Sequence, residues 1–305
     1  MHGLLIHPGE LTKKWIDRMA DAGVRVLGLH PEGGKQAIDS LNNLLRLLET
    51  EEYRALIDYA IDVRGLEIEY EFHAAGWLLS RELFDTHPEY FRMDENGERV
   101  REIDFCLSNT EAIDVIAENA AALAKRLYRS APRYYFWLDD NSKPCGCELC
   151  RAISPSDAQL KVMNAIVTRL RRDDPSATLA YLAYQNFIVP PKTVKPADGI
   201  FLEFAPIKRD MNRPASEGAE LDNVRELLAV FGTQNSKVLE YWYDNSLFSK
   251  WKKPPKQFKA NNELIRGDLD FYCRLGFEVI ASFACFLGDD YEELWGDVDI
   301  GAFGE

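Results

Sequence analysis

Short apolar runs alternate with longer amphipathic stretches along most of the chain. β-Branched and aromatic residues dominate the short runs, as is typical of buried strands. In the longer stretches apolar residues recur every three or four positions, as Trp15, Ile16 and Met19 do between residues 11 and 22. This alternation predicts βα units and a mostly parallel sheet.

The alternation predicts eight strands, at residues 3–7, 24–29, 66–72, 134–138, 179–184, 199–204, 237–242 and 278–286. Helices are expected at residues 11–22, 41–63, 111–128, 156–172, 224–231 and 258–275. A (β/α)₈ barrel needs about 250 residues, and the 305 residues cover it together with one elaborate loop after the third strand. The alternative is a doubly wound open sheet, but such sheets usually stop near six strands and no G-x-G-x-x-G follows the first one. We therefore expect an α/β fold with a single domain over residues 1–305, a (β/α)₈ barrel.

The composition limits the class of partner. Asp and Glu number 50 against 36 Lys and Arg, a net charge of −14, which counts against nucleic acid and anionic membrane surfaces. The longest apolar run, near residues 279–287, has about half of the ~20 residues that a membrane helix needs. The first residues lack the pattern of a signal peptide, so a cytoplasmic location is expected, unless a leader upstream of this sequence directs secretion. Nothing in the pattern indicates an oligomeric state.

Polar and aromatic residues follow the predicted strands. The active site of a (β/α)₈ barrel lies at the carboxyl ends of its strands. The positions there are His7, His30, Glu32, His73, Trp77, Asp139, Asp140, Asn141, Tyr184, Asn186, Glu203, Tyr241, Trp242, Asp244, Asp289 and Asp290. Aromatic rings beside carboxylates and amides suit a sugar, whose C–H faces stack on rings and whose hydroxyls bind polar groups. Lys and Arg are scarce at these positions, which counts against phosphorylated substrates.

The sharpest candidate is the pair Asp139-Asp140, which directly follows the apolar run YYFWL. Adjacent carboxylates repel each other, so in a partly desolvated pocket one can keep its proton near neutrality and act as a general acid. The alternative is that the pair simply begins a loop. His73 is expected to contact a sugar hydroxyl, although a lone histidine equally often serves a structural hydrogen bond.

A family resemblance is carried by HPEYFRMDENGER, FCLSN, LDDN and CGCELC, in this order. Over about residues 73–209 these blocks resemble the family called domain of unknown function 4838. The resemblance implies a glycoside hydrolase-like barrel, with an acidic pair similar to that of β-N-acetylhexosaminidases and O-GlcNAc hydrolases. In those enzymes the first acid orients the 2-acetamido group, whose carbonyl oxygen is the nucleophile, and the second is the general acid/base. Asp139 would then be the polariser and Asp140 the acid/base. The family typically has Asn-Asp where this chain has Asp139-Asp140.

Three functions remain open on this basis. The first is a glycosidase acting on a terminal sugar, with an N-acetylhexosamine and a substrate-assisted retaining mechanism as one version. The second is a glycosidase in which Glu203 or Asp244 is the nucleophile or base. The third is a carbohydrate-binding barrel without catalysis. The acidic pair favours catalysis, because a binding protein gains little from two abutting negative charges.

The cysteines suggest a structural metal. Cys145, Cys147 and Cys150 form CxCxxC, and Cys106 lies in the neighbouring loop. Three thiolates within six residues suit a tetrahedral zinc ion that lacks its fourth ligand, which Cys106 could supply. A disulfide or free thiols are the alternative. The sequence contains no HxH or HExxH, so we expect no catalytic metal and no cofactor for catalysis.

Overall fold

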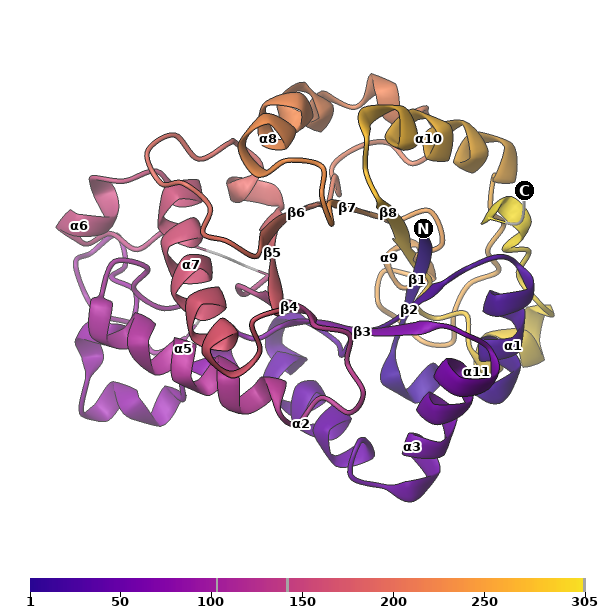
Figure 1. Ribbon diagram of the computed structural model, residues 1–305, viewed down its shortest axis with the longest axis horizontal. Helices are drawn as coiled ribbons and strands as arrows, with labels where there is room; N and C mark the ends of the chain where they lie inside the picture. The colour runs from indigo at the N-terminus through magenta and orange to yellow at the C-terminus, as the bar shows by residue number, and fades with distance from the viewer. Residues whose placement is uncertain (103, 141–142, 304–305) are drawn as a thin grey trace.

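The chain folds into a closed barrel of eight parallel strands (Figure 1). The computed structural model describes residues 1–102, 104–140 and 143–303. The strands are β1 (His2–Ile6), β2 (Val26–Leu29), β3 (Glu67–His73), β4 (Arg133–Trp137), β5 (Thr178–Ala183), β6 (Ile200–Phe204), β7 (Lys237–Glu240) and β8 (Val279–Phe283). β1 pairs with both β2 and β8, which closes the ring. The predicted (β/α)₈ barrel is confirmed.

Helices surround the barrel on the outside (Figure 1). The longer ones are α1 (Lys13–Asp21), α2 (Ala37–Leu47), α3 (Glu51–Asp58), α5 (Thr110–Ala124), α7 (Pro155–Asp173), α8 (Val224–Phe231), α10 (Asn262–Leu275) and α11 (Asp289–Trp295). Short ones are α4 (Ala75–Leu78), α6 (Glu148–Arg151) and α9 (Asn245–Phe248), with a π-helical turn at Tyr59–Val63. Single 3₁₀ turns lie at Pro8–Glu10, Gly34–Gln36, Arg81–Asp85, Pro88–Tyr90, Gln185–Phe187, Ala215–Glu217, Ala219–Asn223 and Gly301–Phe303.

One predicted helix is divided in two. The expected helix over residues 41–63 is α2 followed by α3, because the side chain of Thr50 accepts a hydrogen bond from the backbone N–H of Tyr53 and starts a new helix. None of the helices in the described part of the chain is both long and apolar enough to cross a membrane.

Alternation along the strands decides which side chains enter the barrel. In β3, Glu69, Glu71 and His73 share the inner face, whereas Tyr70 and Phe72 belong to the apolar core between strands and helices. Nζ of Lys237, the first residue of β7, lies 2.8 Å from Oε2 of Glu69 and 2.5 Å from Oε1 of Glu71. These three charged side chains are fully buried, so the middle of the barrel is filled with side chains.

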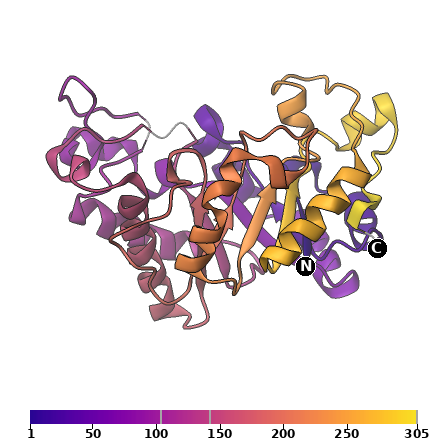
Figure 2. The ribbon, with the colours of Figure 1, turned by 90° about the horizontal axis from the view of Figure 1, so that it is seen from above.

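Two long loops rise on the same side of the molecule (Figure 2). One connects β3 to α5 through residues 74–109, as predicted for the elaborated loop, and the other connects β7 to α10 through residues 241–261. Both begin at the carboxyl ends of their strands, so they enlarge the face on which barrel enzymes carry their active sites.

Candidate active site

A cavity of about 500 Å³ opens at the carboxyl ends of the strands. Its polar lining includes His7, His30, Glu32, His73, Asp140, Tyr184, Tyr241, Asp244 and Ser246. Its apolar lining includes Trp137, Leu182, Leu239, Trp251, Phe283, Cys285 and Phe286. A ligand-sized cavity with an aromatic surface and a few polar groups is the usual form of a small-molecule site.

Asp140 is the member of the acidic pair that lines the cavity. The hydroxyl of Tyr184 donates a hydrogen bond to Oδ1 of Asp140 at 2.9 Å. Burial, and after it the charge of Asp140, raise the pKa of Tyr184 well above its usual value. Tyr184 therefore remains a hydrogen-bond donor at every physiological pH and holds the carboxyl group of Asp140 in one orientation.

Asp139 faces the β3–α5 loop and is not among the residues that line the cavity. Its Oδ2 accepts hydrogen bonds from Nη2 of Arg81 at 3.1 Å and from the backbone N–H of Asp104 at 2.8 Å. In return, the backbone N–H of Asp139 donates to Oδ1 of Asp104 at 3.1 Å. The two adjacent carboxylates thus diverge, and Asp139 ties the end of β4 to the neighbouring loop.

Asp244 is the second buried carboxyl group in the cavity wall. Its Oδ1 accepts hydrogen bonds from the backbone N–H of Leu247 at 3.1 Å and from Oγ of Ser246 at 2.5 Å, so it caps α9. Burial raises the pKa of Asp244 above its usual value. The pKa of Tyr241 is raised well above its usual value by burial and then by nearby acidic groups that include Asp244 and Asp140. The Tyr241 hydroxyl therefore stays protonated close to both carboxyl groups.

Glu203 lies beneath the cavity rather than in its wall. Its carboxyl group is fully buried, and Nε1 of Trp137 donates to its Oε2 at 2.7 Å. Burial raises the pKa of Glu203 to about 6. Trp137 belongs to the cavity lining and Glu203 does not, so of the two predicted alternatives only Asp244 lines the space where a substrate would lie.

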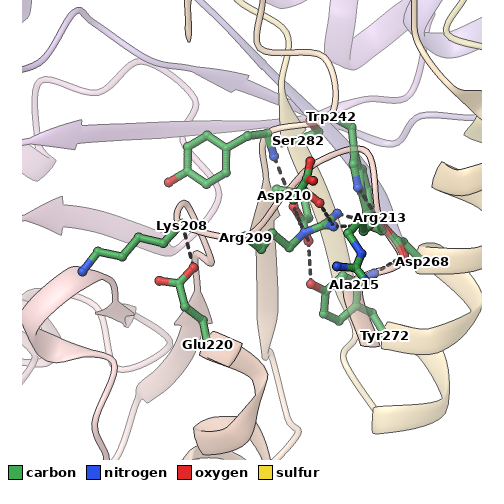
Figure 3. A network of polar contacts seen from close by, with 12 residues as sticks. Lys208, Arg209, Asp210, Arg213, Ala215, Glu220, Trp242, Asp268, Tyr272 and Ser282 are labelled. Atoms are coloured by element: carbon green, nitrogen blue, oxygen red, sulfur yellow. Dashed lines mark hydrogen bonds and ion pairs between the residues drawn. The ribbon is translucent and has the colours of Figure 1, made fainter. Parts of the chain in front are cut away.

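Three other expected contacts do not line the cavity. Trp242 follows the inward-facing Tyr241 and points outward, where its Nε1 donates to Oδ2 of Asp268 at 3.1 Å (Figure 3). Trp77 lies on α4 and its Nε1 donates to Oδ1 of Asn42 at 3.1 Å. Asn186 is exposed in the 3₁₀ turn after β5 and lines a separate hollow beside the cysteines. Asn141 lies outside the described residues.

A buried charged network holds the loop between β6 and α8 against α10 (Figure 3). Nε of Arg209 lies 2.9 Å from Oε1 and 3.1 Å from Oε2 of Glu240, and its Nη2 lies 2.7 Å from Oδ2 of Asp268. The hydroxyl of Tyr272 donates to Oε1 of Glu240 at 2.5 Å. Glu240 therefore serves this network on the outer face of β7, and the loop that it anchors contributes Ile207 to the cavity wall.

Four aromatic lining residues were not among the predicted contacts: Trp137, Trp251, Phe283 and Phe286. Trp137 lies within the strand run YYFWL, and its inward direction could have been found from alternation with Tyr135. Trp251 lies in the long β7–α10 loop and is 67% exposed at the cavity rim. No pattern in the sequence indicates its position.

The four predicted metal ligands lie together. The Sγ atoms of Cys106, Cys145, Cys147 and Cys150 are within 4.8 Å of one another. Sγ of Cys106 is 3.7 Å from Sγ of both Cys147 and Cys150, which is far beyond a disulfide bond length of about 2.05 Å. Four thiols at these separations match the donor set of a structural tetrahedral zinc site.

Comparison with solved structures finds chains of similar fold. The chain is similar to a β-N-acetylhexosaminidase from Bacteroides fragilis NCTC 9343, with 15% identity, a TM-score of 0.54, and coverage of 92% of this chain and 59% of that one. It is also similar to a β-galactosidase from the psychrophilic Marinomonas ef1, with 12% identity, a TM-score of 0.52 and coverage of 92% and 53%. For endo-glycoceramidase II from Rhodococcus sp. the identity is 10%, the TM-score 0.54 and the coverage 93% and 72%.

These identities establish a shared fold and nothing finer, and the chain spans less than two thirds of the length of the first two structures. A comparison with curated proteins finds no match. The model of the family described as domain of unknown function (DUF4838) matches residues 48–282, which is more than half of the chain. With its (β/α)₈ barrel and the sequence blocks around Asp139 and the cysteines, the chain belongs to the DUF4838 family.

Proposed function

We propose that this protein is a glycoside hydrolase that cleaves the bond to a terminal sugar held in the cavity. The observation that carries the proposal is that Asp140 and Asp244 line one cavity whose surface includes Trp137, Tyr241 and Phe283. Two carboxyl groups on either side of a glycosidic bond are the minimum that most glycosidases need, and aromatic rings stack on sugar C–H faces. The fold shared with glycoside hydrolase barrels supports the same class.

Asp140 acts in this proposal as the general acid/base. Its proton passes to the glycosidic oxygen as the bond to the leaving group breaks, and the resulting carboxylate then takes a proton from the attacking water. The hydrogen bond from Tyr184 orients the carboxyl group toward the cavity. Asp139 acts as a positioning residue, because its contacts with Arg81 and Asp104 set where the chain turns after β4.

Asp244 is the proposed second carboxyl group. With a 2-acetamido sugar it would orient the acetamido group, the role that the family resemblance implies for Asp139, and the acetamido oxygen would attack the anomeric carbon. With a sugar that lacks this group Asp244 would itself be the nucleophile or the base. We favour the N-acetylhexosamine version, which is also supported by the similarity in fold to a β-N-acetylhexosaminidase.

The test is a screen with paired aryl glycosides that differ only at C2, carrying either an acetamido group or a hydroxyl. Wild-type protein should turn over the acetamido member, and Asp140→Asn should lower kcat by about 10²–10⁴-fold. Asp198→Asn is the matched control, because Asp198 is exposed just before β6, at the opposite end of the barrel. Equal turnover of both members of a pair would instead make Asp244 the nucleophile or base. Sugar binding without turnover by any variant would favour the carbohydrate-binding barrel.

We further propose that Cys106, Cys145, Cys147 and Cys150 hold one structural zinc ion. Closed sites of four thiolates stabilise the fold of the loops that supply them and leave no position for a substrate. Cys106 is two residues from Asp104, whose backbone N–H binds Asp139, so the ion would steady the end of β4 from outside the cavity. Elemental analysis should find about one zinc per chain. A metal-free protein with four titratable thiols and full activity would contradict this proposal.

A further inference from the structure

Three histidines form one continuous wall of the cavity. His7 follows β1, His30 follows β2 and His73 ends β3, and these strands are neighbours in the barrel. The ring centroids of His7 and His30 are 5.9 Å apart, and those of His30 and His73 are 6.3 Å apart. All three side chains line the cavity.

Each imidazole uses the same atom to bind the backbone of the next strand or its end. Nδ1 of His7 lies 2.8 Å from the carbonyl oxygen of His30, and Nδ1 of His30 lies 2.8 Å from that of Glu71. Nδ1 of His73 lies 2.5 Å from the carbonyl oxygen of Leu138. A carbonyl oxygen can only accept a hydrogen bond, so in each ring Nδ1 must carry the proton. The neutral ring then has a lone pair on Nε2, and Nε2 is an acceptor.

The charge state of the central histidine agrees with this assignment. Burial, helped by the neighbouring His7 and His73, holds the pKa of His30 well below its usual value, so its ring is neutral at pH 7. Among the hydrogen bonds between described residues, none reaches Nε2 of these three rings. The three Nε2 atoms can therefore accept hydrogen bonds from a ligand in the cavity.

The loop after β2 lies against this wall because Gly33 has no side chain. A Cβ atom at Gly33 would lie 2.8 Å from Cδ2 and 3.3 Å from Nε2 of His73. Gly33 itself lines the cavity, so it leaves open the space in front of the His73 ring.

We propose that His7, His30 and His73 form an acceptor wall that binds the hydroxyl groups of a neutral sugar through O–H···Nε2 hydrogen bonds. The wall selects against sugars that present a carboxylate or phosphate there, because an anionic oxygen has no proton to donate to Nε2. The other charged groups of the described lining, Glu32, Asp140 and Asp244, are acids and would also repel an anion. This inference rests on the proposed function and names the substrate chemistry that one side of the cavity takes.

A metal ion is the other ligand that three such histidines could bind, since metal-binding histidines also donate their second nitrogen to carbonyl groups. Within the described residues, however, the cysteine set is the one group whose ligand atoms lie close enough together to share an ion. The separation of the histidines therefore favours separate hydroxyl groups over a common metal.

The test measures binding by calorimetry, which does not depend on turnover. The probes are the methyl β-glycosides of N-acetylglucosamine, glucose and galactose, the uronic acids of the last two, and deoxyfluoro analogues of each neutral sugar. Fluorine does not donate a hydrogen bond. Replacing at least one of the sugar hydroxyls by fluorine should therefore weaken binding about 10-fold. The uronic acids should bind at least 10-fold more weakly than the neutral sugars.

The matched variant is His30→Asn, whose amide N–H can still bind the carbonyl of Glu71 but which has no atom at the place of Nε2. His30→Asn should bind the parent sugar about as weakly as wild type binds the fluoro analogue that shows the loss. His30→Asn should bind that fluoro analogue no more weakly than it binds the parent sugar. His73→Asn should behave in the same way at a different hydroxyl, and thermal unfolding of both variants establishes that they are folded.

The acceptor wall is refuted if every fluoro analogue binds like its parent, if uronic acids bind as tightly as neutral sugars, or if none of the sugars binds. It is also refuted if wild type binds a second Zn²⁺ that His30→Asn loses. Sugar binding with the expected pattern but without turnover of any aryl glycoside would retain the acceptor wall and reject the proposed hydrolase.

Discussion

The replacement Arg209→Met tests whether the charged network of Figure 3 holds the β6–α8 loop in place. The side chain of Arg209 is 1% exposed and pairs with Glu240 and Asp268, whose side chains are 0% and 2% exposed. Methionine fills a similar volume without the charge, so both carboxyl groups lose their counter-ion inside the protein. Removing one partner from a buried ion pair costs about 3–5 kcal/mol, and we expect the free energy of unfolding to fall by that amount.

The loss of stability in Arg209→Met should grow with pH, and the direction of this change follows from the pKa of Glu240. Burial raises the pKa of Glu240 from its usual 4.5 to about 7, so its contribution to stability declines as pH rises toward 7 and is constant above that value. The positive charge of Arg209 lowers this pKa, and without it the pKa must rise further. The variant should therefore continue to lose stability above pH 7, by at most about 3 kcal/mol relative to wild type between pH 7 and 9.

Urea unfolding at pH 6, 7, 8 and 9, followed by tryptophan fluorescence, measures both effects. Arg213→Met is the matched control, because Arg213 is 67% exposed and pairs with Glu217 at the surface, where the expected change is below about 0.5 kcal/mol. The double variant Arg209→Met/Glu240→Gln should lose the additional pH dependence. A loss below 1 kcal/mol for Arg209→Met, or the same loss at every pH, would refute this account of the network.

Three further predictions concern the cavity and the cysteines. Trp251→Ala removes the 67% exposed ring at the rim and should raise KM for aryl glycosides about 10-fold while leaving urea unfolding unchanged; an unchanged KM would exclude stacking on this ring. Tyr184→Phe removes the donor to Asp140 and should lower kcat about 10-fold with little change in KM, and a change in KM alone would show that the hydroxyl binds substrate instead. Cys106→Ser should reduce the zinc content measured by elemental analysis and lower the thermal unfolding temperature, whereas wild-type values for both would remove Cys106 from the ligand set.

The fold could be predicted from the order of apolar runs and amphipathic stretches along the sequence, because hydrophobic periodicity is a local property. Each run of β-branched and aromatic residues is buried on both faces in a parallel barrel, and each amphipathic stretch covers it from outside. The expected strand at residues 134–138, for example, is β4 (Arg133–Trp137) within one residue at each end. The CxCxxC motif likewise indicated its own cluster of thiols, and the position of Cys106 beside it followed from the adjacency of successive loops in a barrel.

Alternation alone would also have separated some of the predicted site residues. Leu239 and Tyr241 face the barrel interior, so the intervening Glu240 and the following Trp242 must face outward, as they do. The same rule places His7, His30 and His73 on the inner face. It does not give depth along the barrel axis, which is why Glu203 was expected in the site although it lies beneath Trp137.

The tertiary structure determines which of Asp139 and Asp140 lines the cavity. Strict alternation from Tyr135 and Trp137 would have placed Asp139 in the cavity, but the strand ends at Trp137 and alternation ends with it. Beyond that point the direction of each side chain depends on which partners other segments supply. Arg81 and Asp104, from a loop more than 30 residues earlier, bind Asp139, and Tyr184, from the next strand end, binds Asp140. Local patterns determine the elements, whereas long-range hydrogen bonds determine which carboxyl group enters the cavity, because those bonds exist only once the barrel has closed.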